Sequence, residues 1–252
     1  MTLVVPPWSA SVVATLPYPV VFATVSGAHL YGFASVDSDL DLRAAHLLPL
    51  PEIIGLRHGP ETVQAGGDRD GVELDVVSHD LLKFARMMLK PNGYVLEQVL
   101  SPLVVATSEV HRELVALAPL CLTANHVRHY LGFAAGQWEL FQRTGELKPA
   151  LYTLRVLLTG IHLMRTGTIE ADLRELWHDA SLPYVPDLIE AKVSGEHRRL
   201  TPDLLDPGRL AADVARLEGV LHAARQATHL PAQPTAAEHL HALLIRARLA
   251  AA

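Results

Sequence analysis

Two aspartates that flank a single leucine, Asp39 and Asp41, stand at the end of a loop, and a third acid, Asp75, follows later in the chain. In an extended strand the side chains of Asp39 and Asp41 share one face, while Leu40 turns to the other. Such carboxylates can converge on a hard cation, because Mg²⁺ prefers oxygen ligands and is usually held by one or two carboxylates together with substrate phosphates. The spacing therefore indicates metal-assisted phosphoryl chemistry, with two solvated acids at a strand end as the alternative.

The loop before this pair opens at Gly27 and contains a second glycine, Gly32. A glycine at such a turn lets backbone N–H groups face a phosphate without a Cβ in the way. Two metal ions beside a phosphate-binding loop can activate an attacking hydroxyl and stabilise a leaving pyrophosphate in an in-line displacement. The loop and the acids together favour this chemistry over a solvated pair.

Three short strands are expected to position these residues. Val20–Val25 is a β-branched apolar run that ends just before the loop, as is typical of a buried strand. Residues 39–42 and 73–77 alternate polar and apolar side chains, so both are predicted to be strands that carry acids. Residues 49–71 contain three prolines and a pair of glycines, which favours a loop or hairpin between them.

Helical spacing of apolar residues replaces this alternation after residue 77. Ser78 is expected to be the N-cap of a first helix that ends before Pro91, and Thr235 with Glu238 has the spacing of a capping box at the start of the last helix. Further helices are predicted over residues 94–100, 109–118, 125–144, 150–166, 171–180, 208–228 and 235–251. The whole pattern predicts an α+β fold, in which a mixed sheet with helices is followed by an all-helical region.

The bulk composition limits the class of protein. Hydrophobic residues make up 50% of the 252 residues, but prolines interrupt the long uncharged N-terminal region, so neither a membrane-spanning helix nor a signal peptide is expected. The single cysteine, Cys121, can form no internal disulfide and is expected to be a buried thiol, which agrees with a cytoplasmic protein. A net charge of −6 argues against a broad nucleic-acid-binding surface, but it permits a local basic channel.

Other chemistries lack their sequence signatures. His111, His126 and His129 come closest to a zinc group, yet they have no cysteine partner and no H-E-x-x-H frame, which favours ordinary core or surface histidines. The sequence contains no G-x-G-x-x-G, no P-loop lysine motif and no G-x-S-x-G motif. Dehydrogenase, kinase and hydrolase interpretations therefore have no motif to support them.

The motifs around the acids resemble those of a known family. Residues from Gly27 to Asp41 follow the pattern G-x-x-x-Y-G-x-x-x-x-x-S-D-x-D, and Asp75 lies in a later hydrophobic strand, which is similar to the active-site pattern of the DNA polymerase beta nucleotidyltransferase superfamily. The run from Asp75 to Glu97 resembles the branch of predicted nucleotidyltransferases associated with RNA ligase and RNA repair. The resemblance covers about residues 20–195 and continues through the helical segments 130–134, 148–160 and 189–192.

This resemblance implies roles for individual residues. Asp39 and Asp41 would be the shared ligands of two Mg²⁺ ions, with Mn²⁺ as a substitute. Asp75 would bind the catalytic metal and help to deprotonate the attacking hydroxyl, with Glu73 on the same strand face as the alternative. The residues expected to bind the nucleotide are Gly27, Ala28, Tyr31, Ser38, Lys148 and Arg155.

The chain departs from the family pattern at Ala28, where family members usually have serine. The backbone N–H groups there can still donate to a phosphate, and Ser26 or Ser38 could supply the missing hydroxyl. Loss of one neutral hydrogen bond is worth about 0.5–1.5 kcal/mol, so the change should weaken nucleotide binding without abolishing the chemistry.

Two further nucleotide-binding assignments have alternatives. Tyr31 can stack on a base or ribose, or it can close the loop onto the core. Lys148 and Arg155 are about two helical turns apart and can share a face, which suits contacts with a triphosphate or with RNA phosphates.

The resemblance implies a polymerase-beta-like catalytic domain over residues 1–110 and a helical domain over residues 111–252. The expected reaction is attack by a hydroxyl, foremost an RNA 3′ end, on the α-phosphorus of a nucleoside triphosphate such as ATP, with release of pyrophosphate. The acidic net charge keeps open transfer to a small molecule or to a protein side chain. Ala28 keeps open the alternative of a non-catalytic nucleotide-binding or partner-regulating module. The three acids argue against this alternative, because a non-catalytic protein has no need to keep three carboxylates that repel one another.

Overall fold

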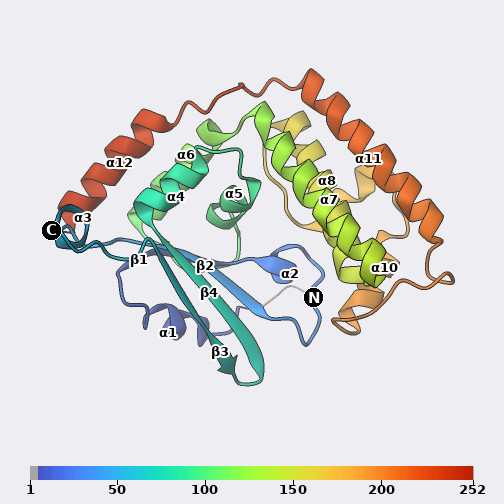
Figure 1. Cartoon of the computed structure of the whole chain (residues 1–252), viewed down its shortest axis with the longest axis horizontal. Helices are drawn as coiled ribbons and strands as arrows, with labels where there is room; N and C mark the ends of the chain where they lie inside the picture. The colour runs from blue at the N-terminus through green and yellow to red at the C-terminus, as the bar shows by residue number, and fades with distance from the viewer. Residues whose placement is uncertain (1–4, 252) are drawn as a thin grey trace. The chain divides into compact units, whose positions relative to one another are not determined.

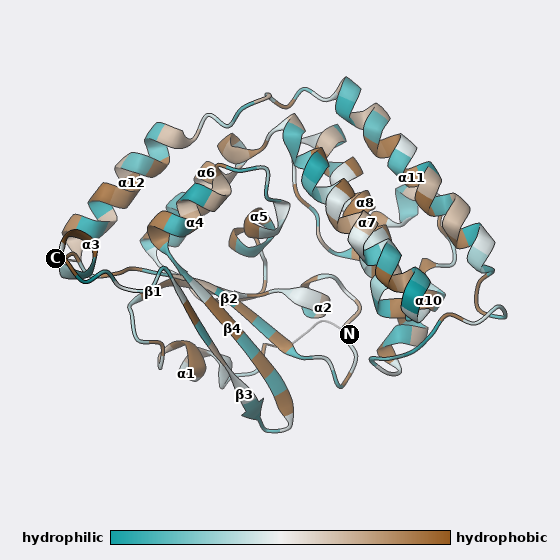
Figure 2. Ribbon diagram, in the orientation of Figure 1, coloured by the Kyte–Doolittle hydropathy of each residue, from teal (hydrophilic) through white to brown (hydrophobic). Residues whose placement is uncertain are grey.

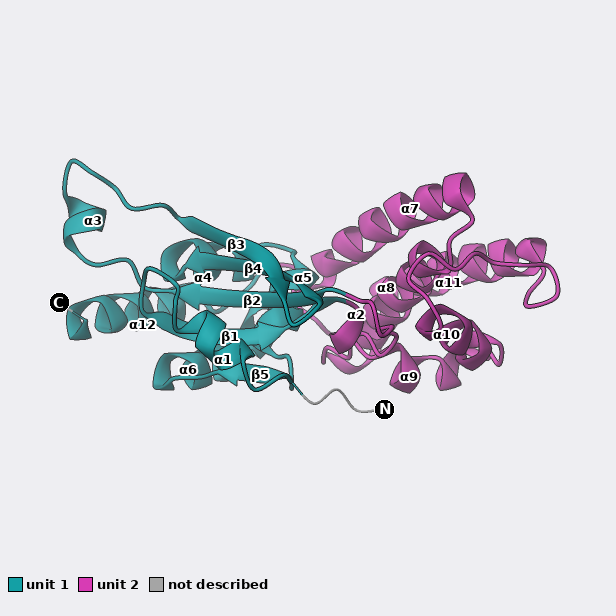
Figure 3. Ribbon diagram, turned by 90° about the horizontal axis from the view of Figure 1, so that it is seen from below, with its two compact units in different colours: residues 1–27, 39–121, 234–252 teal, residues 28–38, 122–233 magenta. Residues whose placement is uncertain are grey.

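The structure is a computed structural model, and it describes residues 5–251. Their contacts form two compact units, drawn in different colours in Figure 3. Unit 1 consists of the chain up to Gly27, residues Asp39–Cys121 and the chain from Pro234 onward. Unit 2 consists of Ala28–Ser38 and Leu122–Gln233. The units therefore interleave along the sequence. The predicted catalytic domain over 1–110 and helical domain over 111–252 stay a prediction, since compactness alone does not show where independently folding domains begin.

Unit 1 is built on a five-stranded mixed sheet with the order β3-β4-β2-β1-β5. Strands β2 and β4 run parallel, and the other neighbours are antiparallel. The strands are β1 (Val20–Val25), β2 (Leu40–His46), β3 (Thr62–Arg69), β4 (Val72–Asp80) and β5 (Val104–Ala106). The predicted strands at 20–25 and 73–77 are confirmed, and the predicted hairpin region contains the short helix α3 (Pro51–Ile54) and then β3, which pairs with β4.

Helices cover both faces of this sheet (Figure 1). Helix α1 (Ser9–Val13) packs through Val13 against Leu40, Leu42 and Val76 on one face. On the other face Phe22 of β1 meets Phe84 edge-on at 5.1 Å between ring centroids. That face is covered by α4 (Leu81–Met88), α5 (Gly93–Val99) and α6 (Glu109–Leu117), with α12 (Ala237–Ala250) against α4 and α6. Hydrophobic and hydrophilic residues alternate along β2 and β4 (Figure 2). This alternation places Asp41 and Asp75 on the sheet face opposite to Leu40, Leu42 and Val76.

Unit 2 is helical and is arranged around α8 (Leu147–Thr166), most of whose residues are buried. The neighbours of α8 are α7 (Val127–Thr144), α9 (Leu173–Leu176), α10 (Val185–Val193) and α11 (Pro207–Ala227). Both α7 and α8 end at glycines in the left-handed conformation, Gly145 and Gly167, which is the usual way for a helix to stop. The loop 28–38, which begins with most of the short helix α2 (Gly27–Leu30), also belongs to this unit.

Two predicted helix caps are wrong, for reasons of tertiary pairing. Ser78 does not cap α4, because β4 continues through Asp80 in register with β2, and Asp80 is the N-cap whose side chain accepts from the backbone N–H of Leu82 at 3.0 Å. Thr235 does not open a capping box, because its N–H donates to the carbonyl of Leu120 at 2.9 Å and α12 begins only at Ala237.

Other helix boundaries differ more modestly. The helix predicted over 171–180 is the short α9 followed by a 3-10 turn at His178–Ala180, and α8 begins three residues earlier than predicted, at Leu147. Helices α1, α2 and α3 and the three-residue strand β5 were not predicted as elements, and α10 was predicted only as the helical segment 189–192. Cys121 is a buried thiol as expected, and burial raises its pKa to about 11. Among residues 5–251, no helix combines the length and the apolar character that crossing a membrane requires.

Candidate active site

Asp41 and Asp75 lie side by side on the parallel strands β2 and β4, as direct register partners. The Oδ1 atom of Asp41 is 2.6 Å from the Nη2 atom of Arg43, and the Oδ2 atom of Asp75 is 2.7 Å from the same nitrogen. The Asp41 side chain is 16% exposed and that of Asp75 is 50% exposed. Two carboxylates therefore converge on one positively charged atom at a place that solvent reaches.

Arg43 is held in this position by further hydrogen bonds. Its Nε donates to the Tyr94 hydroxyl at 2.8 Å, and its Nη1 donates to the backbone carbonyls of Leu42 and Asp75 at 3.1 and 3.0 Å. Burial by itself would lower the pKa of Arg43, but Tyr94 and the two carboxylates outweigh it and raise the pKa above its ordinary value. Sequence reasoning missed Arg43, although its position two residues after Asp41 on a strand places it on the same face.

Gly27 lies against the Asp41 carboxylate. Its φ is +64°, and a Cβ built on Gly27 would be 1.9 Å from the Oδ2 atom of Asp41. The neighbouring Ser26 N–H donates to the Asp41 carbonyl at 2.9 Å, which fixes the end of β1 beside β2. The glycine is therefore required here by a close approach as well as by its backbone conformation.

We expect Gly27→Ala to destabilise the protein by at least about 1 kcal/mol more than Gly71→Ala. Both glycines have positive φ, which costs an alanine about 1–2 kcal/mol, but the space around Gly71 is open while a Cβ at Gly27 must displace the Asp41 carboxylate. Denaturant unfolding of the two variants gives the difference. Equal losses of unfolding free energy would contradict the close packing of Gly27 on Asp41.

Asp39 directly precedes β2 and is partly buried, while Glu73, the alternative third acid, is exposed on β4. Within residues 5–251, no group of three or more His, Cys, Asp or Glu side chains is arranged to hold a metal ion. The donor chemistry of Asp41 and Asp75 nevertheless fits a hard divalent cation, because two carboxylate oxygens are directed at one cationic atom. A metal ion at this point would have to displace the Nη2 group of Arg43.

The other predicted nucleotide-binding residues belong to unit 2. Tyr31 is buried there, and the guanidinium carbon of Arg155 lies 3.8 Å from the centre of its ring. Tyr152 meets the same ring edge-on at 5.4 Å. This packing corresponds to the alternative in which Tyr31 closes the loop onto the core, so contact of Tyr31 or Arg155 with a nucleotide would require the stack to open.

Ser38 and Lys148 meet in a second cluster of unit 2. Lys148 forms an ion pair with Glu196, and the Ser38 hydroxyl donates to the Oε2 atom of Glu196 at 3.1 Å. Lys192, whose side chain is fully buried, pairs with the same carboxylate, and Ser35 donates to it at 2.9 Å. Sequence reasoning did not assign Ser35, Lys192 or Glu196 to the site; the spacing of Lys192 and Glu196, four apart, was the available signal.

The remaining loop residues offer no exposed hydroxyl. Ala28 is buried, and its carbonyl accepts from the Phe33 N–H at 3.1 Å. Ser26, one candidate for the missing serine, is also buried, and its hydroxyl has no hydrogen-bond partner within the described part of the chain. Of the two candidates, only Ser38 has its hydroxyl in a cluster of cationic groups.

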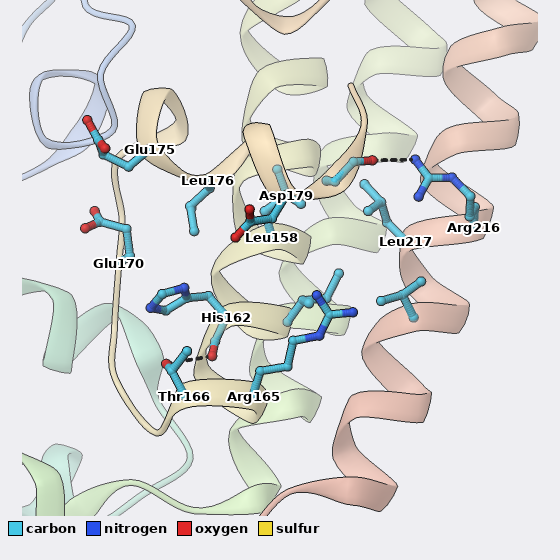
Figure 4. Close-up of a pocket in the computed structure, with 13 residues that line it drawn as sticks. Leu158, His162, Arg165, Thr166, Glu170, Glu175, Leu176, Asp179, Arg216 and Leu217 are labelled. Atoms are coloured by element: carbon cyan, nitrogen blue, oxygen red, sulfur yellow. Dashed lines mark hydrogen bonds between the residues drawn. The ribbon is translucent and has the colours of Figure 1, made fainter. Parts of the chain in front are cut away.

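A pocket of about 280 Å³ lies in unit 2 among α8, α11 and the segment around α9 (Figure 4). Glu170 and Asp179 face it together with Arg165 and Arg216, and Arg216 donates to the carbonyl of Ala180 at 3.1 Å. None of the predicted site residues lines this pocket. Its mixed charges single out no class of ligand.

The mixed sheet carries an acid pair after a glycine turn and a further acid on the adjacent parallel strand. Residues 10–246 match the model of a family described as the RNA repair pathway DNA polymerase beta family. The chain therefore belongs to this family, which confirms the predicted class of enzyme and the family resemblance of the sequence.

Two further proteins are similar to this chain over part of their length. An uncharacterized protein of Methanocaldococcus jannaschii is 30% identical over 154 residues, which is 60% of this chain and 63% of that protein, so the match spans less than two thirds of the relative's length. A crystal structure of a nucleotidyltransferase-like protein from Exiguobacterium sibiricum shares 15% identity and has a TM-score of 0.34, covering 84% of this chain and 72% of that one.

Proposed function

We propose that the protein transfers a nucleoside monophosphate from a nucleoside triphosphate to a hydroxyl acceptor, foremost an RNA 3′ end, and releases pyrophosphate. The observation that carries this proposal is the convergence of the Asp41 and Asp75 carboxylates on one cationic atom. In the transfer, the acceptor oxygen forms a bond to the α-phosphorus while the bond from that phosphorus to the pyrophosphate oxygen breaks. Phosphoryl transfer depends mainly on positioning and charge neutralisation, which a small set of carboxylates can organise.

The individual residues have distinct parts in this proposal. Asp39, Asp41 and Asp75 would hold two Mg²⁺ or Mn²⁺ ions, which when bound activate the attacking hydroxyl and neutralise charge on the leaving group. Asp75, with its half-exposed carboxylate, is the group placed to take the proton of the acceptor hydroxyl. Gly27 supports the site by letting the Asp41 carboxylate lie against the loop backbone.

The binding of the triphosphate is assigned to the loop and to unit 2. Backbone N–H groups at Gly27 and Ala28, the Ser38 hydroxyl and the Lys148 ammonium are the proposed phosphate ligands. Tyr31 and Arg155 belong to this proposal only in a state in which their buried stack has opened.

A non-catalytic nucleotide-binding module is the second candidate, and Arg43 is the observation that favours it. The chain supplies its own cation at the point where the acids converge, which satisfies both carboxylates without a metal ion. Ala28, in place of the family serine, points the same way. Transfer to a small molecule or to a protein side chain remains the alternative for an active enzyme, since the net charge of −6 disfavours a broad RNA-binding surface.

The test is an incubation with Mg²⁺ and each α-labelled nucleoside triphosphate in turn. The acceptors are an RNA with a free 3′-OH, the same RNA with a 3′-phosphate, a tRNA, and no added acceptor. We expect label on the RNA with the free 3′-OH and none on the 3′-phosphate RNA, because only the former has the attacking hydroxyl.

Each other outcome selects a different function. Label on the protein itself, or on a small molecule added from a cell extract, would replace RNA as the acceptor. Absence of label in every arm, together with measurable binding of a nucleotide, would favour the non-catalytic module. Asp75→Asn serves as the matched inactive protein, because it removes the charge and keeps the shape of the side chain.

A further inference from the structure

In unit 2 a single carboxylate accepts hydrogen bonds from four side chains that come from three separate segments. Glu196 pairs with Lys148 through one oxygen and with Lys192 through the other. The hydroxyls of Ser35 and Ser38 both donate to the oxygen that faces Lys192, at 2.9 and 3.1 Å. Lys192 also donates to these hydroxyls, at 2.8 and 3.1 Å, so the four donors form one connected cradle.

The cradle is built as a binding site for an oxyanion. Lys192 is 0% exposed, and a buried ammonium is tolerated only when an anion and hydrogen-bond partners compensate for the lost hydration. Two ammonium groups and two hydroxyls exceed what one carboxylate needs, but they match the several oxygens and the higher charge of a phosphate. Burial alone would raise the pKa of Glu196, yet the hydrogen bonds from Lys148, Lys192 and Ser35 lower it to about 2.

Glu196 can leave this cradle without disturbing a helix. Helix α10 ends at Val193, so Lys192 belongs to the helix whereas Glu196 lies beyond its end, after Gly195. The backbone N–H of Glu196 makes a long contact, 3.4 Å, with the carboxylate of Asp37. Asp37, whose side chain is exposed, is thus a further acid beside the cradle.

We propose that Ser35, Ser38, Lys148 and Lys192 form a phosphate-binding cradle, and that Glu196 occupies it as an internal ligand until a phosphate group of the substrate displaces it. The proposal rests on the proposed function for the identity of the ligand, a nucleoside triphosphate or its pyrophosphate product. Ser38 directly precedes Asp39 in the chain, so filling the cradle with phosphate would hold the residue next to the acid pair. Glu196 is then a self-inhibitory group whose removal tightens phosphate binding.

Binding of inorganic pyrophosphate to the full chain, measured by titration calorimetry, tests the cradle without requiring any transfer. We expect Glu196→Gln to bind pyrophosphate about tenfold more tightly than the unmodified protein. In the unmodified protein the apparent affinity for pyrophosphate is lowered, because only the fraction of molecules whose cradle is not filled by Glu196 can bind it. Lys148→Gln should bind it about tenfold more weakly, because it removes a charge-assisted donor. Glu190→Gln, an exposed acid on α10, changes the net charge equally and should alter the affinity less than about twofold.

An unchanged or weakened affinity in Glu196→Gln would overturn the proposal, provided that thermal unfolding shows the variant to be folded. If that variant does not fold, Lys148→Gln decides alone, since its side chain is 33% exposed and an unchanged affinity would equally overturn the cradle. Tighter pyrophosphate binding by Glu196→Gln without transfer to any acceptor would contradict the proposed function but support the phosphate-binding cradle. Transfer to an acceptor without these changes in pyrophosphate affinity would support the proposed function and contradict the cradle.

Discussion

Replacement of Asp41 by asparagine is expected to reduce nucleotidyl transfer by about a thousandfold or more. Loss of one neutral hydrogen-bond donor to a transition state already costs about 100- to 1,000-fold, and Asp41→Asn removes a full charge from the proposed metal site. The effect should appear in the rate of label incorporation under saturating nucleotide. The same variant should lose binding of Mn²⁺, which electron paramagnetic resonance detects independently of the reaction.

The expected change in stability is small by comparison. Asparagine keeps an oxygen that can accept from Arg43, and Asp75 retains its own bond to the same guanidinium, so the loss should be about 1 kcal/mol in denaturant unfolding. Asp70→Asn is the matched control, because it removes an acid at the exposed β3–β4 turn in a left-handed conformation that asparagine tolerates. Transfer by Asp41→Asn at the rate of the control would refute the assignment of Asp41.

The local elements of this fold could be predicted because their signals are local. Alternation over residues 73–77 identifies β4 without any knowledge of its neighbours, and the register of parallel strands then sets Asp75 beside Asp41. The same alternation put Asp41 and Arg43 on one face, yet it could not show that Arg43 would bridge two acids, because that contact needs the second strand. The convergence of acids was thus foreseeable, but the cation at their centre was not.

Features fixed by distant segments could not be foreseen. Ser78 has the residue type of a helix cap, but pairing with Ala44 of β2 and Val63 of β3 keeps it in the sheet. The cradle around Glu196 joins residues more than a hundred positions apart, and only its Lys192–Glu196 spacing is visible locally. The interleaving of the two units has the same cause, since nothing near Pro234 in the sequence indicates that the chain returns to unit 1.

A buried ion pair joins the returning helix α12 to the rest of unit 1, and it is the basis of the second large prediction. In unit 1, the Nη2 atom of Arg248 on α12 lies 2.7 and 2.6 Å from the two carboxylate oxygens of Asp80, and its Nη1 donates to the Leu48 carbonyl at 2.6 Å. The side chains are 9% and 3% exposed. Asp80 also accepts from the N–H groups of Leu48 and Leu82, so it joins the segment just after β2, the start of α4 and helix α12 at one point.

We expect Arg248→Met to lower the free energy of unfolding by about 3–5 kcal/mol. Methionine preserves much of the apolar stem, so the loss comes mainly from leaving the Asp80 carboxylate buried without its cation. Arg246→Met on the same helix is the matched control, because Arg246 pairs with Glu113 at the surface, where the side chains are 59% and 40% exposed and such a pair contributes about 0.2–1 kcal/mol. Denaturant unfolding of both variants measures the difference.

A double variant separates loss of the charge pair from loss of packing. Asp80→Asn together with Arg248→Met leaves no uncompensated charge, so it should recover part of the stability that Arg248→Met loses, and the two changes should be far from additive. Additive losses would mean that Arg248 acts through packing alone. A buried charge left without its partner must cost more free energy of unfolding than a solvated one. Equal losses of unfolding free energy for Arg248→Met and Arg246→Met would therefore show that the Arg248–Asp80 ion pair does not hold α12 in unit 1.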